Sequence, residues 1–289
     1  MDSKENLMEQ VKNKKPNIGP LFVFIASLCF AIGGLCIKSI DWNPMAINGG
    51  RNFIAAIVFG VYLLITHHKL TINKPVIIGA LSMSATTILF TFANKMTTAA
   101  NTIILQYTAP IFVIILSAII FKTKPKKLDI VAVVLIFGGV VCFFIDSLSE
   151  GNMPGNALAL LSGVTYAGIF MMNSAERADS LSSTFFGMCI NIIVGAPFLF
   201  MQDYSATSTS AWIAFICLGL FQVGFGYVCL NIGLKTTSAT MASLVCGLEP
   251  VLNPVLVAIV YHETLTPLSL IGAAIVFITI IVYNVINSR

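Results

Sequence analysis

The stretch NKMTTAANTIILQYTAPIFVIIL, residues 94–116, consists of a short basic loop followed by a long apolar span with a proline in its middle. A shift of the chain by 140 residues places it over LKTTSATMASLVCGLEPVLNPVL, residues 234–256, which has the same organisation. The chain therefore contains an internal repeat, whose clearest element is this proline-containing span. Five positions are identical in the two copies: Lys95/Lys235, Thr97/Thr237, Ala99/Ala239, Pro110/Pro250 and Leu116/Leu256.

The composition is that of a membrane protein. Of the 289 residues, 57% are hydrophobic and 10% are charged, whereas soluble domains carry about a quarter charged residues. A bilayer core of about 30 Å is crossed by about 20 apolar helical residues, and the alternation typical of a barrel strand is absent. We predict an all-α integral membrane protein with ten transmembrane helices near 20–37, 44–66, 76–93, 98–121, 130–145, 155–175, 182–201, 211–233, 239–261 and 268–286.

The repeat extends to the first span, since a shift of 136 residues places Gly19 over Gly155. We therefore predict an N-terminal tail at 1–19 and two five-helix repeats at 20–146 and 155–286. Because five is odd, the second repeat must cross the membrane upside down relative to the first. Inverted repeats are typical of secondary transporters, whose site lies near the midplane between the halves.

Basic residues are distributed unequally between the two sides of the membrane. Of the 16 Lys and Arg, thirteen lie on the side of the N-terminus, Lys38 and Lys95 lie on the other side, and Arg51 lies within a span. Cytoplasmic loops carry the excess of Lys and Arg, so both termini are predicted to be cytoplasmic. The lysine-rich tail lacks a cleavage site and is expected to be retained. The predicted location is the cytoplasmic (inner) cell membrane, with a multi-pass topology.

One acid stands inside the second copy of the repeated span, where the first copy has Ala109. Glu249 is the eleventh residue of the span 239–261, which places it near the midplane, about 15 Å from either end at a rise of about 1.5 Å per residue. A charge there costs at least ~2.5–3.5 kcal/mol, so the side chain should face a wet cavity, meet a partner or stay protonated. Glu249 is therefore a candidate proton or cation site, or alternatively a structural carboxyl bonded to a neighbouring helix.

The residues that follow Glu249 are also unusual for a span. Asn253 lies one turn further on and shares its helix face. Pro250 and Pro254 remove two backbone donors and are expected to kink the helix, which leaves the carbonyls near 246 and 250 without their usual partners. Such a loosened backbone either serves a gate or binding site or is a static kink.

Further polar and aromatic residues inside the spans are candidates for a central cavity. Such residues also hold helices together, so packing is the alternative for each. Arg51 either extends to the outer surface or pairs with an acid or a substrate carboxylate, and tyrosines with a carboxylate are suited to an ammonium group. The candidate substrate-binding residues are Glu249, Asn253, Tyr227, Asn231, Gln106, Tyr107, Asn101, Tyr166 and Arg51.

Other classes of protein and site fit the sequence poorly. The seven cysteines fall in apolar runs without a CxxC pair, so we expect neither disulfides nor a metal site, and no cofactor. The net charge of +4 is dispersed, which argues against a nucleic-acid partner. An intramembrane enzyme would need a catalytic set, yet only Glu249 and Arg51 ionise inside the spans besides cysteines and tyrosines. A passive channel would show rings of like residues; both classes are remote alternatives.

Two long segments resemble the paired EamA domains of the drug/metabolite transporter superfamily. They are ANKMTTAANTIILQYTAPIFVIILSAIIFKTK at 93–124 and GLKTTSATMASLVCGLEPVLNPVLVAIVYHETLTPLSLIGAAIVF at 233–277, and the resemblance extends over about 20–286. It implies ten helices in two inverted five-helix repeats, a central cavity and secondary transport of small metabolites. Amino acids, their analogues and cationic compounds are common substrates of the superfamily.

Individual residues match and depart from that family pattern. Pro110 and Pro250 fit its prolines, Arg51 fits the arginine of its second span, and Glu263 fits the glutamate that ends the repeated span. The first repeat has Thr123 where that glutamate is common. The first span also departs, since it has Phe30 in place of a common tryptophan.

Together these features predict a secondary active transporter, not an enzyme, of a small polar or zwitterionic metabolite such as an amino acid or analogue. Alternating access and outward transport are expected, with proton coupling left open. The alternative is an importer of an organic cation such as a quaternary amine, with the tyrosines as its cage. The expected partners are the substrate, the lipid bilayer and coupled protons, for a monomer or a homodimer.

Overall fold

Long apolar helices make up the part of the protein that the structure describes. The computed structural model describes residues 17–144, 152–252 and 266–288, and these ranges contain no strand. As predicted, the fold is all-helical, with the helices of a multi-pass membrane protein. Seven helical stretches are long and apolar enough to cross a membrane: Gly19–Lys38, Pro44–Ile65, Lys74–Met96, Asn101–Ile120, Met153–Met172, Ser180–Met201 and Thr209–Leu234.

Several of these stretches are built from consecutive helical segments. One of them contains a π-helical segment, a rare form that is frequent at functional sites. The elements are α2 (Gly19–Phe30), α3 (Gly33–Lys38), α4 (Pro44–Ile65), α5 (Lys74–Met96), α6 (Ala99–Gln106), α7 (Ala109–Ile120), α8 (Lys127–Phe144), α9 (Met153–Met172), α10 (Ser180–Met201), α11 (Thr209–Cys217), the π-helical η2 (Leu218–Phe225), α12 (Gly226–Leu234), α13 (Ala239–Cys246) and α15 (Pro267–Ser288).

Short polar residues define where many helices begin. Asn43 accepts a hydrogen bond from the backbone N–H of Met45 at the start of α4, and Asn73 accepts one from Val76 at the start of α5. Such caps satisfy backbone donors that have no partner within the helix. The polar loop residues therefore fix the ends of the apolar spans. Equivalent caps are Thr98 of α6, Asn152 of α9, Asp179 of α10, Ser208 of α11 and Ser238 of α13.

The two proline-containing spans break at matching places. The first span ends as α6 at Gln106 and resumes as α7, with Pro110 in its first turn. In the second, α13 ends at Cys246, a turn follows, and helical backbone resumes at 249–252. Proline has no N–H to donate and clashes with the carbonyl four residues earlier, so each break falls where that clash would occur. The predicted kink at Pro250 is therefore present, while Pro254 lies outside the described residues.

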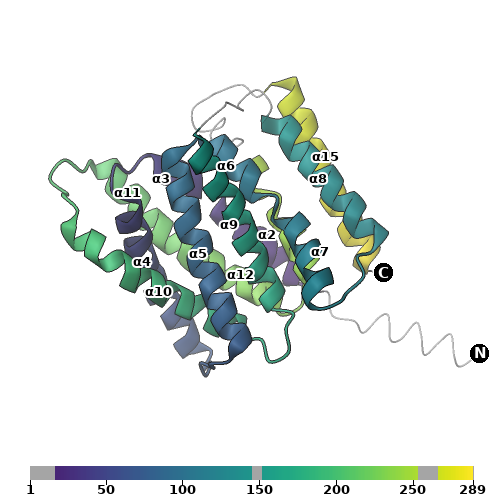
Figure 1. Ribbon diagram of the computed structural model, residues 1–289, viewed down its shortest axis with the longest axis horizontal. Coiled ribbons are helices and arrows are strands. Elements are labelled where there is room, and N and C mark those ends of the chain that lie inside the picture. The colour runs from purple at the N-terminus through teal and green to yellow at the C-terminus, as the bar shows by residue number, and fades with distance from the viewer. Residues whose placement is uncertain (1–16, 145–151, 253–265, 289) are drawn as a thin grey trace, which may run out of the picture.

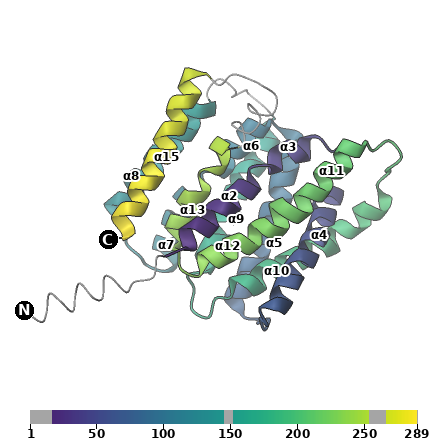
Figure 2. The ribbon, with the colours of Figure 1, turned by 180° about the vertical axis from the view of Figure 1, so that it is seen from behind.

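Helices distant in sequence pack side by side. Helix α5 lies against both α9 and α10, α4 lies against α10 and η2, and α2 lies against α12 and α13. Helices α8 and α15 form a pair at one edge of the molecule, beside α7 and α13 (Figures 1 and 2). The remaining helices form the main body of the bundle around α5 and α9 (Figure 1).

Close backbone approach joins α4 to α10. A Cβ atom added to Gly49 would lie 2.7 Å from the Cα atom of Gly195, far inside van der Waals contact. Small residues of this kind let membrane helices approach closely. The pair of glycines therefore sets the distance between these two helices.

One end of the bundle is held by a polar cluster around Asp179. His68 Nε2 lies 3.0 Å from Asp179 Oδ2, and Thr71 Oγ1 donates to the same oxygen at 2.9 Å. The carboxylate also accepts hydrogen bonds from the backbone and the hydroxyl of Ser182. The cluster ties the loop between α4 and α5 to the loop between α9 and α10.

Candidate functional site

A small cavity lies between α2, α4, α5, α6, α9, η2 and α12. Its volume is about 30 Å³, room for about two water molecules at 10–15 Å³ each. A metabolite-sized ligand therefore requires the surrounding side chains to move apart. The residues that line the cavity are Phe30, Arg51, Thr86, Thr87, Phe90, Gln106, Tyr166, Gln222, Val223, Tyr227 and Glu249.

Glu249 is held at the break that follows α13. Its side chain is buried, and its Oε2 atom accepts a hydrogen bond of 2.7 Å from the hydroxyl of Tyr107. The same hydroxyl contacts the backbone carbonyl of Cys246. That carbonyl is the one that would accept from residue 250 in a continuous helix, and Pro250 has no N–H to give it. Tyr107 therefore supplies the missing donor and positions the acid in one arrangement.

The hydroxyl of Tyr107 has one proton for two acceptors. It lies within hydrogen-bond distance of both Cys246 O and Glu249 Oε2. A tyrosine hydroxyl donates once and also accepts. Both contacts are full hydrogen bonds when Glu249 is protonated and donates to Tyr107, while Tyr107 donates to Cys246. This arrangement can thus accommodate a proton on Glu249, and it rearranges when that proton leaves.

Arg51 also lines the cavity, where polar groups surround its guanidinium. It is 1% exposed, and a guanidinium remains charged in proteins. Its Nη2 atom donates to Thr91 Oγ1 at 2.7 Å and to Thr87 O at 3.0 Å, and its Nη1 atom donates to Gln222 Oε1 at 3.2 Å. The Nε atom is buried without a hydrogen-bond partner among the described residues. Neutral groups alone therefore surround the guanidinium in the described part of the chain.

A buried network supports the residues around Arg51. Asn191 of α10 donates to Thr87 Oγ1 at 2.7 Å and accepts from Ser84 Oγ at 2.7 Å. Asn48 Oδ1 accepts from Arg51 Nη2 at 3.1 Å. The network joins α4, α5 and α10 around the cation, while Arg51 Nε and Asn48 Nδ2 have no hydrogen-bond partner among the described residues.

The cation and the acid line one cavity without contacting each other. In the described ranges the ion pair that forms is the one between His68 and Asp179, and none joins Arg51 to Glu249. Aromatic rings complete the wall, with Phe30 and Tyr227 packed at a centroid distance of 5.2 Å. The cavity thus offers a positive group, a carboxyl group and aromatic faces to one small ligand.

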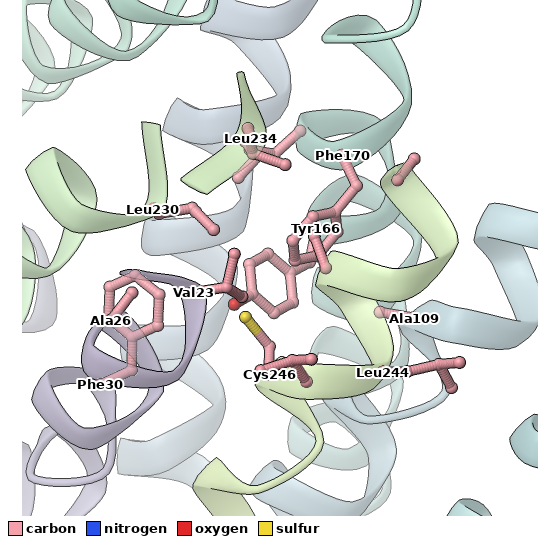
Figure 3. Close-up of a cluster of buried hydrophobic side chains, with 14 of the residues drawn as sticks. Val23, Ala26, Phe30, Ala109, Tyr166, Phe170, Leu230, Leu234, Leu244 and Cys246 are labelled. Atoms are coloured by element: carbon pink, nitrogen blue, oxygen red, sulfur yellow. The ribbon is translucent and has the colours of Figure 1, made fainter. Parts of the chain in front are cut away.

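Apolar side chains pack on one side of the cavity. Figure 3 shows Val23, Leu230, Leu234 and Phe170 gathered with Tyr166, whose hydroxyl points toward the thiol of Cys246. These apolar side chains fill the space between α2, α9, α12 and α13 on that side.

Hydrogen bonds close the opposite end of the bundle. Lys38 Nζ donates to Thr97 O at 2.8 Å, and Thr97 Oγ1 donates to Asn156 Oδ1 at 2.8 Å. Lys95 Nζ contacts the carbonyl of Ile40. Among the residues that the structure describes, these contacts join α3, α5 and α9 at that end.

The structure brings together part of the residue set predicted from the sequence. Glu249, Tyr227, Gln106, Tyr166 and Arg51 all line the cavity. Tyr107 does not line the cavity, but its hydroxyl group is hydrogen-bonded to Glu249. These six residues are thus part of one arrangement.

The other predicted residues lie elsewhere. Asn231 lies away from the cavity and donates to Thr184 Oγ1 at 3.0 Å and to Tyr227 O at 2.8 Å. Asn101 is near the start of α6 and donates to Asn156 Oδ1 at 3.3 Å. Asn253 lies outside the described residues.

Several cavity residues are not in the list of candidate substrate-binding residues, although Gln222, a polar residue of the predicted span 211–233, is itself a sequence candidate for the cavity wall. Gln222 and the backbone carbonyl of Thr87 accept hydrogen bonds from Arg51, and the hydroxyl of Thr87 accepts one from Asn191. Their polarity in the middle of apolar spans is the same signal that singled out Gln106. Phe30 and Val223 carry no such signal, because an apolar residue in a span is ordinary.

The fold and the cavity define the class: an all-helical, multi-pass membrane protein with a polar site between its helices. A family model described as "EamA-like transporter family" matches the chain twice, over residues 17–145 and 153–285. The chain belongs to the EamA-like transporter family.

Curated relatives are similar over most of their length, and all three compared here are named uncharacterized transporters. One from Clostridium kluyveri is 27% identical, covering 72% of this chain and 70% of the relative. One from Archaeoglobus fulgidus is 26% identical over 92% and 98% of the two chains. YwfM from Bacillus subtilis is 26% identical over 93% and 95%.

A solved crystal structure has the same fold. It superposes with a TM-score of 0.80 at 16% identity, covering 95% of this chain and 100% of that one. At this identity the likeness establishes the fold alone.

Proposed function

We propose that the protein is a secondary active transporter that exports a small zwitterion of the amino-acid class by alternating access. The observation that carries the proposal is a small cavity lined by both Arg51 and Glu249, which form no ion pair with each other among the described residues. A buried cation and a buried acid kept apart are costly unless something compensates them. A ligand with one carboxylate and one ammonium group complements both.

Each end of such a ligand has a plausible partner. The substrate carboxylate would bind Arg51, whose buried Nε atom lacks a partner among the described residues and whose planar guanidinium suits carboxylates. The ammonium group would bind Glu249 and the faces of Tyr227 and Phe30, since aromatic faces attract cations. Glu249 would exchange its proton for that ammonium group, which gives a route to proton coupling.

The proposed architecture is ten spans in two inverted five-helix repeats, at 20–146 and 155–286, after a tail at 1–19. Helices α8, α13 and α15 lie at the three predicted spans that are not among the seven long stretches. The packing partners also support it. In the proposed repeat, α9 is the counterpart of α2, α10 of α4, and α5 of both η2 and α12. The contact of α2 with α12 therefore corresponds to that of α9 with α5, and the contact of α4 with η2 corresponds to that of α10 with α5. All four contacts occur.

Contacts between loops agree with the proposed topology, in which both termini are cytoplasmic and the protein lies in the cytoplasmic membrane. Loops predicted on the cytoplasmic side meet at His68 and Asp179. Loops predicted on the outer side meet at Trp42, whose indole N–H donates to Thr207 Oγ1 at 2.9 Å. A cavity between these two sides agrees with alternating access, in which the site lies near the midplane between the halves.

Counterflow in proteoliposomes tests the proposed substrate class. Three matched compounds separate the two ends of the ligand: an α-amino acid, its amide, which lacks the carboxylate, and the corresponding 2-hydroxy acid, which lacks the amine. We expect the amino acid to compete with labelled substrate and both analogues to fail. If the amide competes as well as the amino acid, Arg51 does not bind a carboxylate and the zwitterion proposal is wrong.

Glu249→Gln tests the role of the acid in the same assay. Transport and its pH dependence should both fall sharply, whereas Glu176→Gln, at an exposed acid between α9 and α10, should behave as the wild type. Unchanged transport by Glu249→Gln would contradict the assignment.

The second candidate is import of an organic cation, favoured by the aromatic lining alone. A quaternary amine would then compete in counterflow while amino acids would not. Export and import are separated by comparing efflux and uptake in right-side-out vesicles.

A further inference from the structure

A second polar cavity lies where α7 ends and α8 begins, away from the central site. Its volume is about 370 Å³, and its lining includes Lys124, Lys126, Ser117, Ser238 and Thr240. This is far larger than the central cavity. It lies on the side that the loop charges predict to be cytoplasmic.

An apolar cavity continues from it along the helices. Its volume is about 440 Å³, and it is lined entirely by side chains of α7 and α8 with Gly138 in its wall. Ile114 lines both cavities, so the polar and apolar parts adjoin. Together they form a groove, here called the α7–α8 groove, that is polar and basic at one end and apolar along the other.

The polar end carries an excess of positive charge, because its lysines outnumber its one acid, Asp129. Lys122, Lys124, Lys126 and Lys127 are all exposed, and none of their ammonium groups forms an ion pair within the described residues. The acid in the polar cavity, Asp129, is already engaged. Its Oδ1 atom accepts from the hydroxyl of Tyr283 at 2.6 Å and its Oδ2 atom from the backbone N–H of Lys126 at 3.2 Å.

We propose that the α7–α8 groove binds one anionic phospholipid. The phosphate of the headgroup lies against Lys124 and Lys126, and one acyl chain follows the apolar part past Ile114 toward Gly138. The order of the two parts matches a lipid of the cytoplasmic leaflet, with its charge at the membrane surface and its chain directed inward. Basic pockets between membrane helices on the cytoplasmic side suit anionic headgroups.

Native mass spectrometry of the purified full-length protein tests the charged end. Phosphatidylglycerol and phosphatidylcholine with identical acyl chains are added separately, and we expect a one-to-one complex with phosphatidylglycerol. The double variant Lys124→Gln/Lys126→Gln should weaken it roughly 5-fold for each lysine removed. Lys69→Gln/Lys74→Gln is the matched control, because it removes two exposed lysines from another loop on the same predicted side.

Gly138→Leu tests the apolar part. A Cβ atom added to Gly138 meets nothing within 4 Å, so the side chain enters the groove without a clash, and leucine favours a helix over glycine. We expect this variant to lose phosphatidylglycerol while keeping its melting temperature in detergent. Gly139 is unsuitable, because its added Cβ would lie 2.9 Å from the carbonyl of Gly272.

Four outcomes would overturn the proposal. Equal binding of phosphatidylcholine would remove the role of the lysines, and unchanged binding by Gly138→Leu would remove the role of the groove. Inorganic phosphate that raises the melting temperature as much as phosphatidylglycerol would indicate an anion site without a lipid. A dimer lost in Gly138→Leu would make this face an interface between two copies.

Discussion

Pro250 and Tyr107 together position the side chain of Glu249. The proline removes a donor from the helix, and the tyrosine from the other half of the chain replaces it at Cys246 while also binding Glu249. The same hydroxyl therefore couples the backbone break to the side chain that we propose to carry the proton.

Tyr107→Phe removes this hydroxyl and keeps the ring. The buried carbonyl of Cys246 and the carboxyl of Glu249 would each lose a partner, which costs roughly 1–3 kcal/mol per unsatisfied group. We expect a lower melting temperature and a changed pH dependence of counterflow, because Glu249 loses the group that rearranges with its proton. Tyr62→Phe, at a half-buried tyrosine outside the cavity, is the control. A pH profile identical to that of the wild type would separate Tyr107 from the proton step.

Close packing of α4 on α10 is a property of whole helices. Gly195→Ala would place a methyl group inside van der Waals contact with Gly49, and the two helices would have to separate. We expect a clear loss of monodisperse protein in fluorescence-detected size exclusion and a lower melting temperature. Gly60→Ala is the matched control on α4, because its added Cβ has no neighbour closer than 3.9 Å. Equal stability of the two variants would show that α4 and α10 adjust freely.

The link between the α4–α5 loop and the α9–α10 loop depends on a charged Asp179. Burial raises the pKa of this carboxyl, but hydrogen bonds from Ser182, Thr71 and His68 outweigh it, so the pKa lies below its ordinary value of 3.8. Because the folded pKa is depressed, the stabilisation is complete above the ordinary value and is lost as the pH falls through the lower, folded value.

Asp179→Asn should therefore lower the melting temperature at pH 7, and the difference from the wild type should persist down to about pH 4. Below that pH the melting temperatures of the two proteins should converge, since the side chain at position 179 is then neutral in both. Glu176→Gln, in the same loop and exposed, should follow the wild type throughout. A constant difference at all values of pH would indicate that the loss is one of packing alone.

At the scale of the whole molecule, two glycines stand at opposite ends of the bundle. A Cβ atom added to Gly155 would lie 2.9 Å from the Cβ of Met96 and 3.0 Å from that of Thr97. One added to Gly19 would lie 2.9 Å from the carbonyl of Gly233. A larger residue at either position should hold that end apart.

Cysteine labelling measures which end opens. In a background without the native cysteines, Thr86→Cys places a thiol in the cavity wall. With Gly155→Val added, a membrane-impermeant maleimide should react from the outside; with Gly19→Val added, it should react from the cytoplasm. Without either valine the reaction should be slow from both sides. Reaction from the same side in both variants would contradict alternating access between these ends.

Periodicity and composition were sufficient to predict the all-helical fold and the approximate ends of the helices that the structure describes. The apolar spans must be helical because no other form satisfies the backbone in lipid, and Asn, Ser and Thr at their starts supply the caps. The break before Pro110 and the break before Pro250 follow from the missing N–H of proline, a purely local effect. The prediction that the carbonyl near 246 needs a new partner also followed from local chemistry.

The sequence by itself therefore determined the membrane class, the helices and an acid that had to be buried or bound. Only the tertiary structure decided that Tyr107 satisfies both Cys246 and Glu249, that Gln222 and Thr87 surround Arg51, and that Asn231 lies outside the cavity. Helical periodicity says which residues share a face. It does not say which face meets which neighbour, because that depends on the packing of helices more than a hundred residues apart in the chain.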